Sequence, residues 1–327
     1  MIGLIFFSCK KDADSLSNPG VDVYVAGYEF NGYANIAKYW KNGKAVALTD
    51  STADAYAGSI VIVGSDVYVT GGEYGVVKYW KNGQAAALTD GTAPAGAGSI
   101  AVAGGNVYVA GQEFNGYGGT SIAKYWKNGQ AKPLSDGSRW AFANSIAVVG
   151  SDVYVAGILD NDAWFSVATY WKNGQAVSLT DGTRWGEAWS IAVVGSDIYV
   201  AGREYNNAVM IAKYWKNGQA IPLTDGSKDA LALSIAVVGS NVYVAGWEGN
   251  AAKYWKNGQA VALTDGTKYA WAGSIAVAGD DIYVAGYEET EAGSGKNVAK
   301  YWKNGTAVTL GDPSRNSEAS SVFLVKK

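Results

Sequence analysis

Two short strings of residues recur seven times along the chain, and their regular spacing is the strongest constraint on its fold. Tyr-Trp-Lys-Asn-Gly begins at Tyr39, Tyr79, Tyr125, Tyr170, Tyr214, Tyr254 and Tyr301. Val/Ile-Tyr-Val-Ala/Thr-Gly is centred on Tyr24, Tyr68, Tyr108, Tyr154, Tyr199, Tyr243 and Tyr283. Successive Trp residues of the first string are 40 to 47 residues apart. A period of this length indicates that each repeat is one supersecondary unit.

Each repeat predicts four short β-strands. Strand one is a Ser-Ile-Ala-Val-Val segment, such as residues 145–149, and the β-branched and aromatic Val-Tyr-Val string suits strand two. Ala-Lys-Tyr-Trp is strand three, and the Asn-Gly after it predicts a type I′ hairpin turn into strand four. Four strands in about 45 residues is the period of a propeller blade. The sequence therefore predicts an all-β fold, a seven-bladed β-propeller of four-stranded antiparallel blades.

The two ends of the repeat array are incomplete in complementary ways. The chain enters its first repeat at strand two, at Val21, and the final segment 321–325 matches strand one alone. We expect this C-terminal strand to pair with the N-terminal blade, which closes the ring and removes an open sheet edge. The propeller is assigned to residues 21–327.

The Val-Tyr-Val-Ala-Gly strand, repeated over residues 21–325, resembles bacterial seven-bladed propeller repeats. The resemblance implies the fold, since such families share no single activity. Ahead of the repeats, Leu-Ile-Phe-Phe-Ser-Cys at 4–9, followed by Lys-Lys-Asp, resembles the end of a Bacteroidetes lipoprotein signal. That resemblance implies a signal remnant over 1–9 with a lipidated Cys9, a tether over 10–20, and a cell-envelope location at the outer membrane or cell surface.

Composition excludes several classes of activity. The chain has no His and one Cys, which excludes Ser-His-Asp and Cys-His catalysis, His-ligated zinc and internal disulfides. Its 26 basic and 29 acidic residues lack the basic surplus that nucleic-acid binding requires. No apolar run reaches the roughly 18 residues of a membrane span, so a membrane is expected to be contacted only through the lipid anchor.

The chain is also expected to be a monomer without a cofactor or a metal site. Asp160-Asn161-Asp162 is a weak calcium candidate, because no Asp-x-Asp-x-Asp-Gly loop is present.

Variation between repeats is confined to two connections. From each Trp to the next strand-two Tyr is always 28 residues, so all length variation lies between strands two and three. The side chains also vary in the connection from strand four to the next strand one. Because strands alternate in direction, both connections emerge on one face of the ring, which we call the variable face. The opposite face carries the Asn-Gly turns, and we call it the uniform face.

Large aromatic and basic side chains occupy the variable connections, at positions expected to be exposed loops. Ala alternates with them, which predicts an extended segment whose varying side chains point away from tight packing. Large aromatic residues beside cations are typical of recognition surfaces. The candidate ligand-binding residues are Tyr56, Arg139, Trp140, Phe142, Arg184, Trp185, Glu187, Trp189, Lys268, Tyr269 and Trp271. The alternative is that these rings pack between neighbouring loops.

Residues shared by all or most repeats are interpreted as structural. The seven Trp residues of Tyr-Trp-Lys-Asn-Gly are expected to pack between blades. Six repeats carry a Glu after strand two and a Lys in strand three, whereas the fourth repeat has Leu159 and Thr169 in their places. Joint loss of both charges predicts ion pairs across the hairpin. Examples are Glu29 with Lys38 and Glu73 with Lys78.

The sequence leaves more than one function open. The first is a non-enzymatic binding or scaffold propeller that recognises a glycan or a protein through the variable face. The second is a glycan hydrolase or lyase with carboxylates and Tyr at the channel mouth, for which Glu187, Asp229 and Glu318 are candidates. The third is a duplicated ring with no ligand beyond a structural partner. No catalytic residue is assigned.

Overall fold

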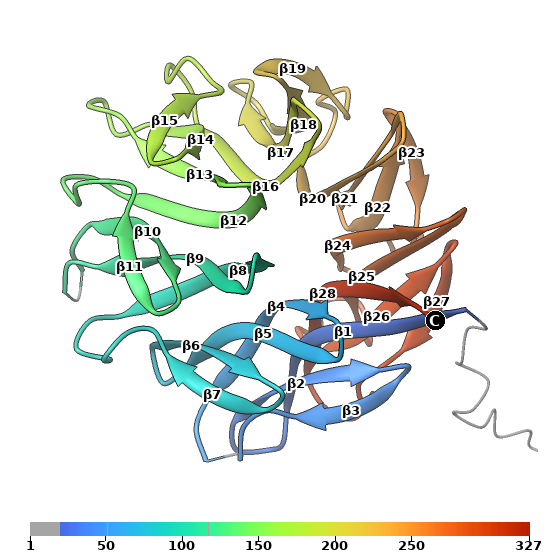
Figure 1. Ribbon diagram of the computed structural model, residues 1–327. Helices are drawn as coiled ribbons and strands as arrows, with labels where there is room; N and C mark the ends of the chain where they lie inside the picture. The colour runs from blue at the N-terminus through green and yellow to red at the C-terminus, as the bar shows by residue number, and fades with distance from the viewer. Residues whose placement is uncertain (1–19, 51, 117) are drawn as a thin grey trace, which may run out of the picture.

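A computed structural model describes residues 20–50, 52–116 and 118–327. Within them the chain forms seven separate four-stranded antiparallel sheets, arranged radially around a central opening (Figure 1). This confirms the predicted seven-bladed β-propeller. The described residues include no helix long and apolar enough to cross a membrane. Cys9 and the predicted signal remnant lie outside the described residues.

The blades are numbered from the N-terminus, and each is given from its innermost to its outermost strand. Blades 1 to 4 are β28 (Ser317–Lys326), β1 (Val21–Phe30), β2 (Asn35–Lys41) and β3 (Lys44–Ala47); β4 (Ala55–Val63), β5 (Asp66–Glu73), β6 (Val76–Lys81) and β7 (Gln84–Ala87); β8 (Ala95–Ala103), β9 (Asn106–Phe114), β10 (Ser121–Lys127) and β11 (Gln130–Pro133); β12 (Ala141–Val149), β13 (Asp152–Asp160), β14 (Ser166–Lys172) and β15 (Gln175–Ser178). Blades 5 to 7 are β16 (Gly186–Val194), β17 (Asp197–Tyr205), β18 (Met210–Lys216) and β19 (Gln219–Pro222); β20 (Ala230–Val238), β21 (Asn241–Glu248), β22 (Ala251–Lys256) and β23 (Gln259–Ala262); β24 (Ala270–Ala278), β25 (Asp281–Glu289), β26 (Asn297–Lys303) and β27 (Thr306–Thr309).

Ring closure occurs in blade 1, where the two ends of the chain meet. β28 pairs antiparallel with β1, with Val21 opposite Lys326 and Glu29 opposite Ser317. The C-terminal strand is therefore the innermost strand of a blade whose other three strands are N-terminal. This confirms the predicted closure and leaves β1 without an open edge.

The innermost strands begin four residues earlier than the sequence pattern indicated. In blade 4 the strand starts at Ala141, and its register against β13 shifts between Ala143 and Ser145, which leaves Asn144 unpaired. Such a β-bulge inserts one extra residue and bends the strand. A register shift occurs at the same place in all seven blades. The predicted extended segment is thus the first part of the innermost strand, and a bulge separates it from the Ser-Ile-Ala-Val-Val part.

The Gly that ends each Val-Tyr-Val-Ala-Gly string is explained by this bulge. A Cβ atom on any of the seven would lie 1.8 to 2.2 Å from a carbonyl oxygen of the innermost strand. For Gly246 the distance to the Leu231 oxygen is 1.9 Å. No residue with a side chain fits without moving the backbone, so the repeated Gly is a packing requirement.

The repeated Trp residues fill the junctions between blades. All seven are at most 2% exposed, and each belongs to its own hydrophobic cluster. Trp80 of blade 2, for example, packs with Tyr24 and Ala26 of blade 1. These rings have no access to a ligand, and their role is to hold neighbouring blades together.

The uniform face is uniform because its turns are tightly bonded. Asn42 and Gly43 have φ of 50° and 79°, as the predicted type I′ turn requires. Asn42 Oδ1 accepts a hydrogen bond from Val23 N, and Asn42 Nδ2 donates to Asp22 Oδ1, both at 2.9 Å. Equivalent pairs of bonds occur in the other six blades. The turn lysines also lie over the strand-two tyrosines, 5.1 to 5.6 Å from the ring centroids.

Candidate functional site

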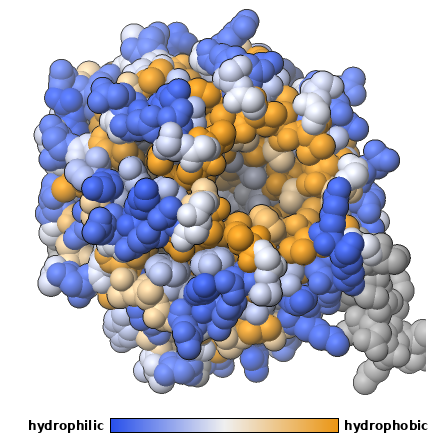
Figure 2. Space-filling model, viewed as in Figure 1, coloured by the Kyte–Doolittle hydropathy of each residue, from blue (hydrophilic) through white to orange (hydrophobic). Residues whose placement is uncertain are grey.

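A cavity of about 610 Å³ lies at the centre of the ring, and all seven blades contribute to its wall. Figure 2 shows one face of the molecule, with a hollow at the centre surrounded largely by apolar side chains. The innermost strands run from the variable face towards the uniform face. Residues near their beginnings therefore form the part of the wall closest to the variable loops.

A closed ring of serine hydroxyl groups lines the cavity. The residue after each Ser donates its backbone N–H to the Ser Oγ of the preceding blade, at 3.0 to 3.4 Å. The ring passes through the closed blade without a break, because Val322 N donates to Ser274 and Ile60 N donates to Ser321. The seven members are Ser59, Ser99, Ser145, Ser190, Ser234, Ser274 and Ser321.

The residue immediately before each Ser also lines the cavity. It sits at the bulge, which turns its side chain towards the centre of the ring. The seven bulge residues are Gly58, Gly98, Asn144, Trp189, Leu233, Gly273 and Ser320. Sequence reasoning named only Trp189 among them, because a bulge cannot be recognised without the partner strand.

Two residues before the bulge, each innermost strand carries a varying residue that pairs with a varying residue of strand two. We call these the mouth pairs. They are Glu318 with Tyr28, Tyr56 with Gly72, Gly96 with Gln112, Phe142 with Ile158, Glu187 with Arg203, Leu231 with Trp247, and Trp271 with Tyr287. The strand-two members were missed by sequence reasoning. The signal that could have found them is that each directly follows the repeated Gly, at a position that holds six different residue types among the seven blades.

The cavity wall is asymmetric although the blades are alike. Blades 2 and 3 contribute Gly58 and Gly98, whereas blades 4, 5 and 7 contribute Phe142, Trp189 and Trp271. Large rings therefore occupy only part of the wall. This asymmetry defines one side on which a ligand can stack and another that leaves it space.

The aromatic side of the wall is best developed in blade 7. The rings of Trp271 and Tyr287 are stacked, with centroids 6.2 Å apart and planes within 3°. Trp247 of blade 6 lies 6.1 Å from Trp271, and Tyr269 lies 6.3 Å from Tyr287. The indole and phenol rings present both an apolar face and a hydrogen-bonding edge.

Glu318 stands next to these rings, in the closing strand of blade 1. Its Oε1 accepts a hydrogen bond from Asn297 Nδ2 at 2.9 Å, and Tyr28 lies opposite it in the neighbouring strand. Burial and the negative charge of Glu318 raise the pKa of both Tyr28 and Tyr287. Both phenols therefore stay protonated at neutral pH.

The other candidate carboxylates are occupied by neighbouring groups. Glu187 forms a two-pronged ion pair with Arg203, at 2.8 and 3.0 Å, and accepts a hydrogen bond from Trp189 Nε1 at 2.9 Å. Asp229 is exposed and accepts a hydrogen bond from Met210 N at 2.8 Å. Glu318 is the one charged residue among the described residues that line the cavity.

The candidate ligand-binding residues are divided among several places. Phe142, Trp189 and Trp271 line the central cavity. Arg184 and Trp185 line a separate cleft of about 540 Å³ at the edge of blade 5. The structure therefore does not bring all the candidates together into one site.

Most of the aromatic candidates are not the exposed loop residues that the sequence predicted. Of the seven aromatic candidates, only Trp185 is exposed, at 53%, and the other six are half-buried. Trp140 stacks on Phe142 with 6.0 Å between centroids, and its edge meets Phe114. The reason is that the innermost strand reaches further than expected, so these rings pack against the strand beside them.

The remaining candidates have individual roles. The Tyr56 hydroxyl accepts a hydrogen bond from Ala97 N at 3.1 Å and so links blades 2 and 3. Arg139 forms an ion pair with Asp162, and Lys268 is half-buried on the connection into blade 7. Asp160 accepts a hydrogen bond from Ser166 Oγ at 2.8 Å. The described residues contain no group of three or more His, Cys, Asp or Glu suited to a metal ion.

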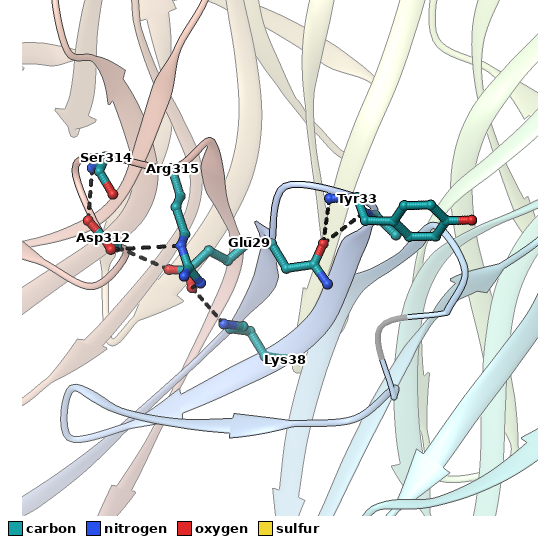
Figure 3. Close-up of polar contacts among 8 residues, drawn as sticks. Glu29, Tyr33, Lys38, Asp312, Ser314 and Arg315 are labelled. Atoms are coloured by element: carbon teal, nitrogen blue, oxygen red, sulfur yellow. Dashed lines mark hydrogen bonds and ion pairs between the residues drawn. The ribbon is translucent and has the colours of Figure 1, made fainter.

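The Glu and Lys residues of the hairpins are in contact in six blades. Lys38 Nζ lies 3.0 Å from Glu29 Oε1, and Lys78 pairs with Glu73. The same pairing occurs in blades 3, 5, 6 and 7. Figure 3 shows that Glu29 also accepts a hydrogen bond from Asp312 N, at 3.0 Å, and faces Arg315. Glu29 thus joins blade 1 to the connection that leaves blade 7.

Comparisons with known proteins bear on the fold. No protein-family model matches the chain, and a search of the curated proteins finds no match. A Mycobacterium tuberculosis puromycin-hydrolysing peptidase matches with a TM-score of 0.59 and 9% identity, over 88% of this chain and 53% of that one. Pyrococcus horikoshii acylaminoacyl peptidase matches with a TM-score of 0.53 and 11% identity, over 91% and 52%. A chain of a nidogen/laminin complex matches with a TM-score of 0.46 and 12% identity, over 72% and 89%.

The chain spans about half the length of the two peptidase chains. At these identities the similarity concerns the fold alone. The protein is a seven-bladed β-propeller, a fold that supports a binding or scaffold role in general and does not by itself determine a function.

Proposed function

We propose that this propeller is a non-enzymatic binding protein that takes a glycan into the central cavity from the variable face. The observation that carries the proposal is the stacked pair Trp271 and Tyr287 in the cavity wall. Gln112, Asn144 and the serine ring add amide and hydroxyl groups to the same wall. Aromatic faces pack on the C–H faces of sugar rings, and amides and hydroxyls match sugar hydroxyl groups.

The size and shape of the cavity favour a small ligand. Its volume of about 610 Å³ lies within the roughly 300–1,000 Å³ of ligand pockets. A protein partner would instead bury about 800 Å² on each side of a broad contact. A short oligosaccharide that enters end-on fits the observed geometry better.

Binding is favoured over glycan cleavage. Hydrolysis of a glycosidic bond uses two carboxyl groups about 5–10 Å apart, and Glu318 is the one carboxylate among the described lining residues. Glu187 is neutralised by Arg203. A lyase would need a phenolate as base, and the raised pKa of Tyr28 and Tyr287 opposes its formation.

The proposal includes a lipid anchor at Cys9 and a place in a bacterial cell envelope, as in Bacteroidetes lipoproteins. Strand β1 starts on the uniform face, where Lys327 N donates to the Gly20 carbonyl at 3.0 Å. A tether from Cys9 to Gly20 spans at most about 40 Å. The uniform face would therefore lie nearest the membrane, and the cavity mouth would point outward. Palmitate labelling of the expressed protein tests the anchor, since Cys9→Ser should remove the label. A wild-type protein without label would overturn it.

A glycan array of the purified chain tests the binding function, with a variant that fills the cavity. A Cβ on Gly58 would meet no atom closer than 3.5 Å, so a larger side chain can extend into the cavity. We expect Gly58→Phe to abolish binding of the glycans that the wild type retains, without a change in melting temperature. Trp185→Ala, in the outer cleft, is the matched control and should bind normally. Retained binding by Gly58→Phe, or no glycan bound by the wild type, would refute the proposal.

A further inference from the structure

Glu318 is the one carboxylate among the described residues that line the central cavity, and no ion pair within the described part of the chain involves its side chain. Glu187 is paired with Arg203, and the hairpin glutamates are paired with lysines. Among the described residues, the donor to the Glu318 carboxylate is the neutral amide of Asn297. Keeping a carboxylate partly out of water is costly unless a positive charge or several hydrogen bonds offset it.

The fold itself does not require a carboxylate at this position. The six other blades carry Tyr56, Gly96, Phe142, Glu187, Leu231 and Trp271 in its place. The blades close around all of these side chains with the same bulge and the same serine ring. The charge of Glu318 therefore serves something other than blade packing.

The surroundings of Glu318 suit a cation. Tyr28 lies opposite it in the neighbouring strand, and Trp271 and Tyr287 line the same cavity. Aromatic faces attract an ammonium group through their negative π clouds. Burial and the nearby charge of Glu318 both raise the pKa of Tyr28 and Tyr287. No lysine or arginine lies among the described lining residues to compete with a cationic ligand.

We infer that the ligand of the central cavity carries a positively charged amino group, which Glu318 binds beside the rings of Trp271 and Tyr287. This inference rests on the proposed function. It specifies the ligand as an oligosaccharide with unacetylated amino sugars. An ammonium group can donate to the free lone pairs of Glu318 while its sugar ring packs on the aromatic wall. An N-acetyl group at the same position would offer a neutral amide and leave the carboxylate uncompensated.

Calorimetric titration with two matched ligands tests the inference. One is a tetrasaccharide of glucosamine and the other is its fully N-acetylated form, both at about pH 6, where the amine is protonated. We expect the wild type to bind the amino form at least tenfold more tightly, a difference of about 1.4 kcal/mol. Glu318→Gln, which keeps the size of the side chain, should abolish that preference. The control Glu291→Gln removes an exposed charge from the loop between β25 and β26 and should keep it.

A second measurement needs no variant. Tetramethylammonium chloride should displace the amino tetrasaccharide from the wild type more strongly than sodium chloride of the same ionic strength. Equal affinities for the two tetrasaccharides, unchanged by Glu318→Gln, would overturn the inference and leave glycan binding intact. If neither sugar binds but tetramethylammonium binds and requires Glu318, the cation site stands and the glycan function fails. If nothing binds, both fail.

Discussion

Replacing Ser99 with Ala tests whether the serine ring holds the blades together. Ser99 Oγ accepts a hydrogen bond from Ile146 N at 3.0 Å, the shortest bond of the ring. Ile146 is only 6% exposed, so the substitution leaves its N–H without an acceptor next to the core. An unsatisfied buried donor costs about 1–3 kcal/mol.

The chain contains its own matched control. Ile100 N lies 3.4 Å from Ser59 Oγ, at the weak end of hydrogen-bond geometry, and Ile100 is equally buried. Ser59→Ala removes the same hydroxyl from the same position of the neighbouring blade. We expect it to cost less than Ser99→Ala, because less hydrogen-bond energy is lost.

The expected shift in melting temperature follows from the size of the protein. An unfolding entropy of about 2.1 cal/mol/K per residue over 327 residues gives about 0.7 kcal/mol/K. A loss of about 1–3 kcal/mol then lowers the melting temperature by about 1.5–4.5 °C. Calorimetry and urea denaturation of the two variants measure the difference. Equal losses of stability for both variants would refute this explanation. No loss of stability for Ser99→Ala would also refute it, and would show that water in the channel replaces the hydroxyl.

Three further predictions concern closure, the bulge and acid stability. Deleting residues 318–327 removes most of β28 and exposes the edge of β1, so we expect aggregation or a large drop in melting temperature, and an unchanged melting temperature would contradict the closure. Gly246→Ala places a Cβ 1.9 Å from a carbonyl oxygen, and we expect it to lower the free energy of unfolding by about 1–3 kcal/mol or more, measured by urea denaturation. The Cβ of the control Gly58→Ala meets nothing closer than 3.5 Å, so this variant should lose little stability. Hydrogen bonding from Lys81 lowers the pKa of Asp66, and similar contacts lower the pKa of other aspartates on the uniform face. The stability that these aspartates contribute is fully present above their unfolded-state pKa of about 3.9. It is lost as the pH falls through their folded-state pKa. Melting temperatures should therefore fall below about pH 4, and constant values from pH 5 to pH 2.5 would refute this assignment.

The propeller could be read from the sequence because its determinants are local and repeated. Asn-Gly selects a type I′ turn whatever surrounds it, and the same string seven times counts the blades. The match between residues 321–325 and strand one predicted the closure because the missing strand had six copies for comparison. The hairpin ion pairs were visible for a related reason, since Leu159 and Thr169 replace both charges in a single blade.

The bulge could not be predicted from the sequence. It depends on the register between two strands, and a shift of one residue changes which side chains face the channel. Trp140 and Trp271 therefore looked like loop residues, although Trp271 lies within the innermost strand β24 and Trp140 directly precedes β12. The strand-two members of the mouth pairs were overlooked for the same reason.

The sequence by itself determined the number of blades, their turns and the way the ring closes, because each of these can be found by comparing short strings between the repeats. Only the tertiary structure decided which varying residues share a cavity. Glu318 and Tyr28 stand near opposite ends of the chain and become neighbours when β28 pairs with β1. Trp271 and Tyr287 complete the group from the adjacent blade. No local pattern carries such a contact, because it exists only once all seven blades have packed and the ring has closed.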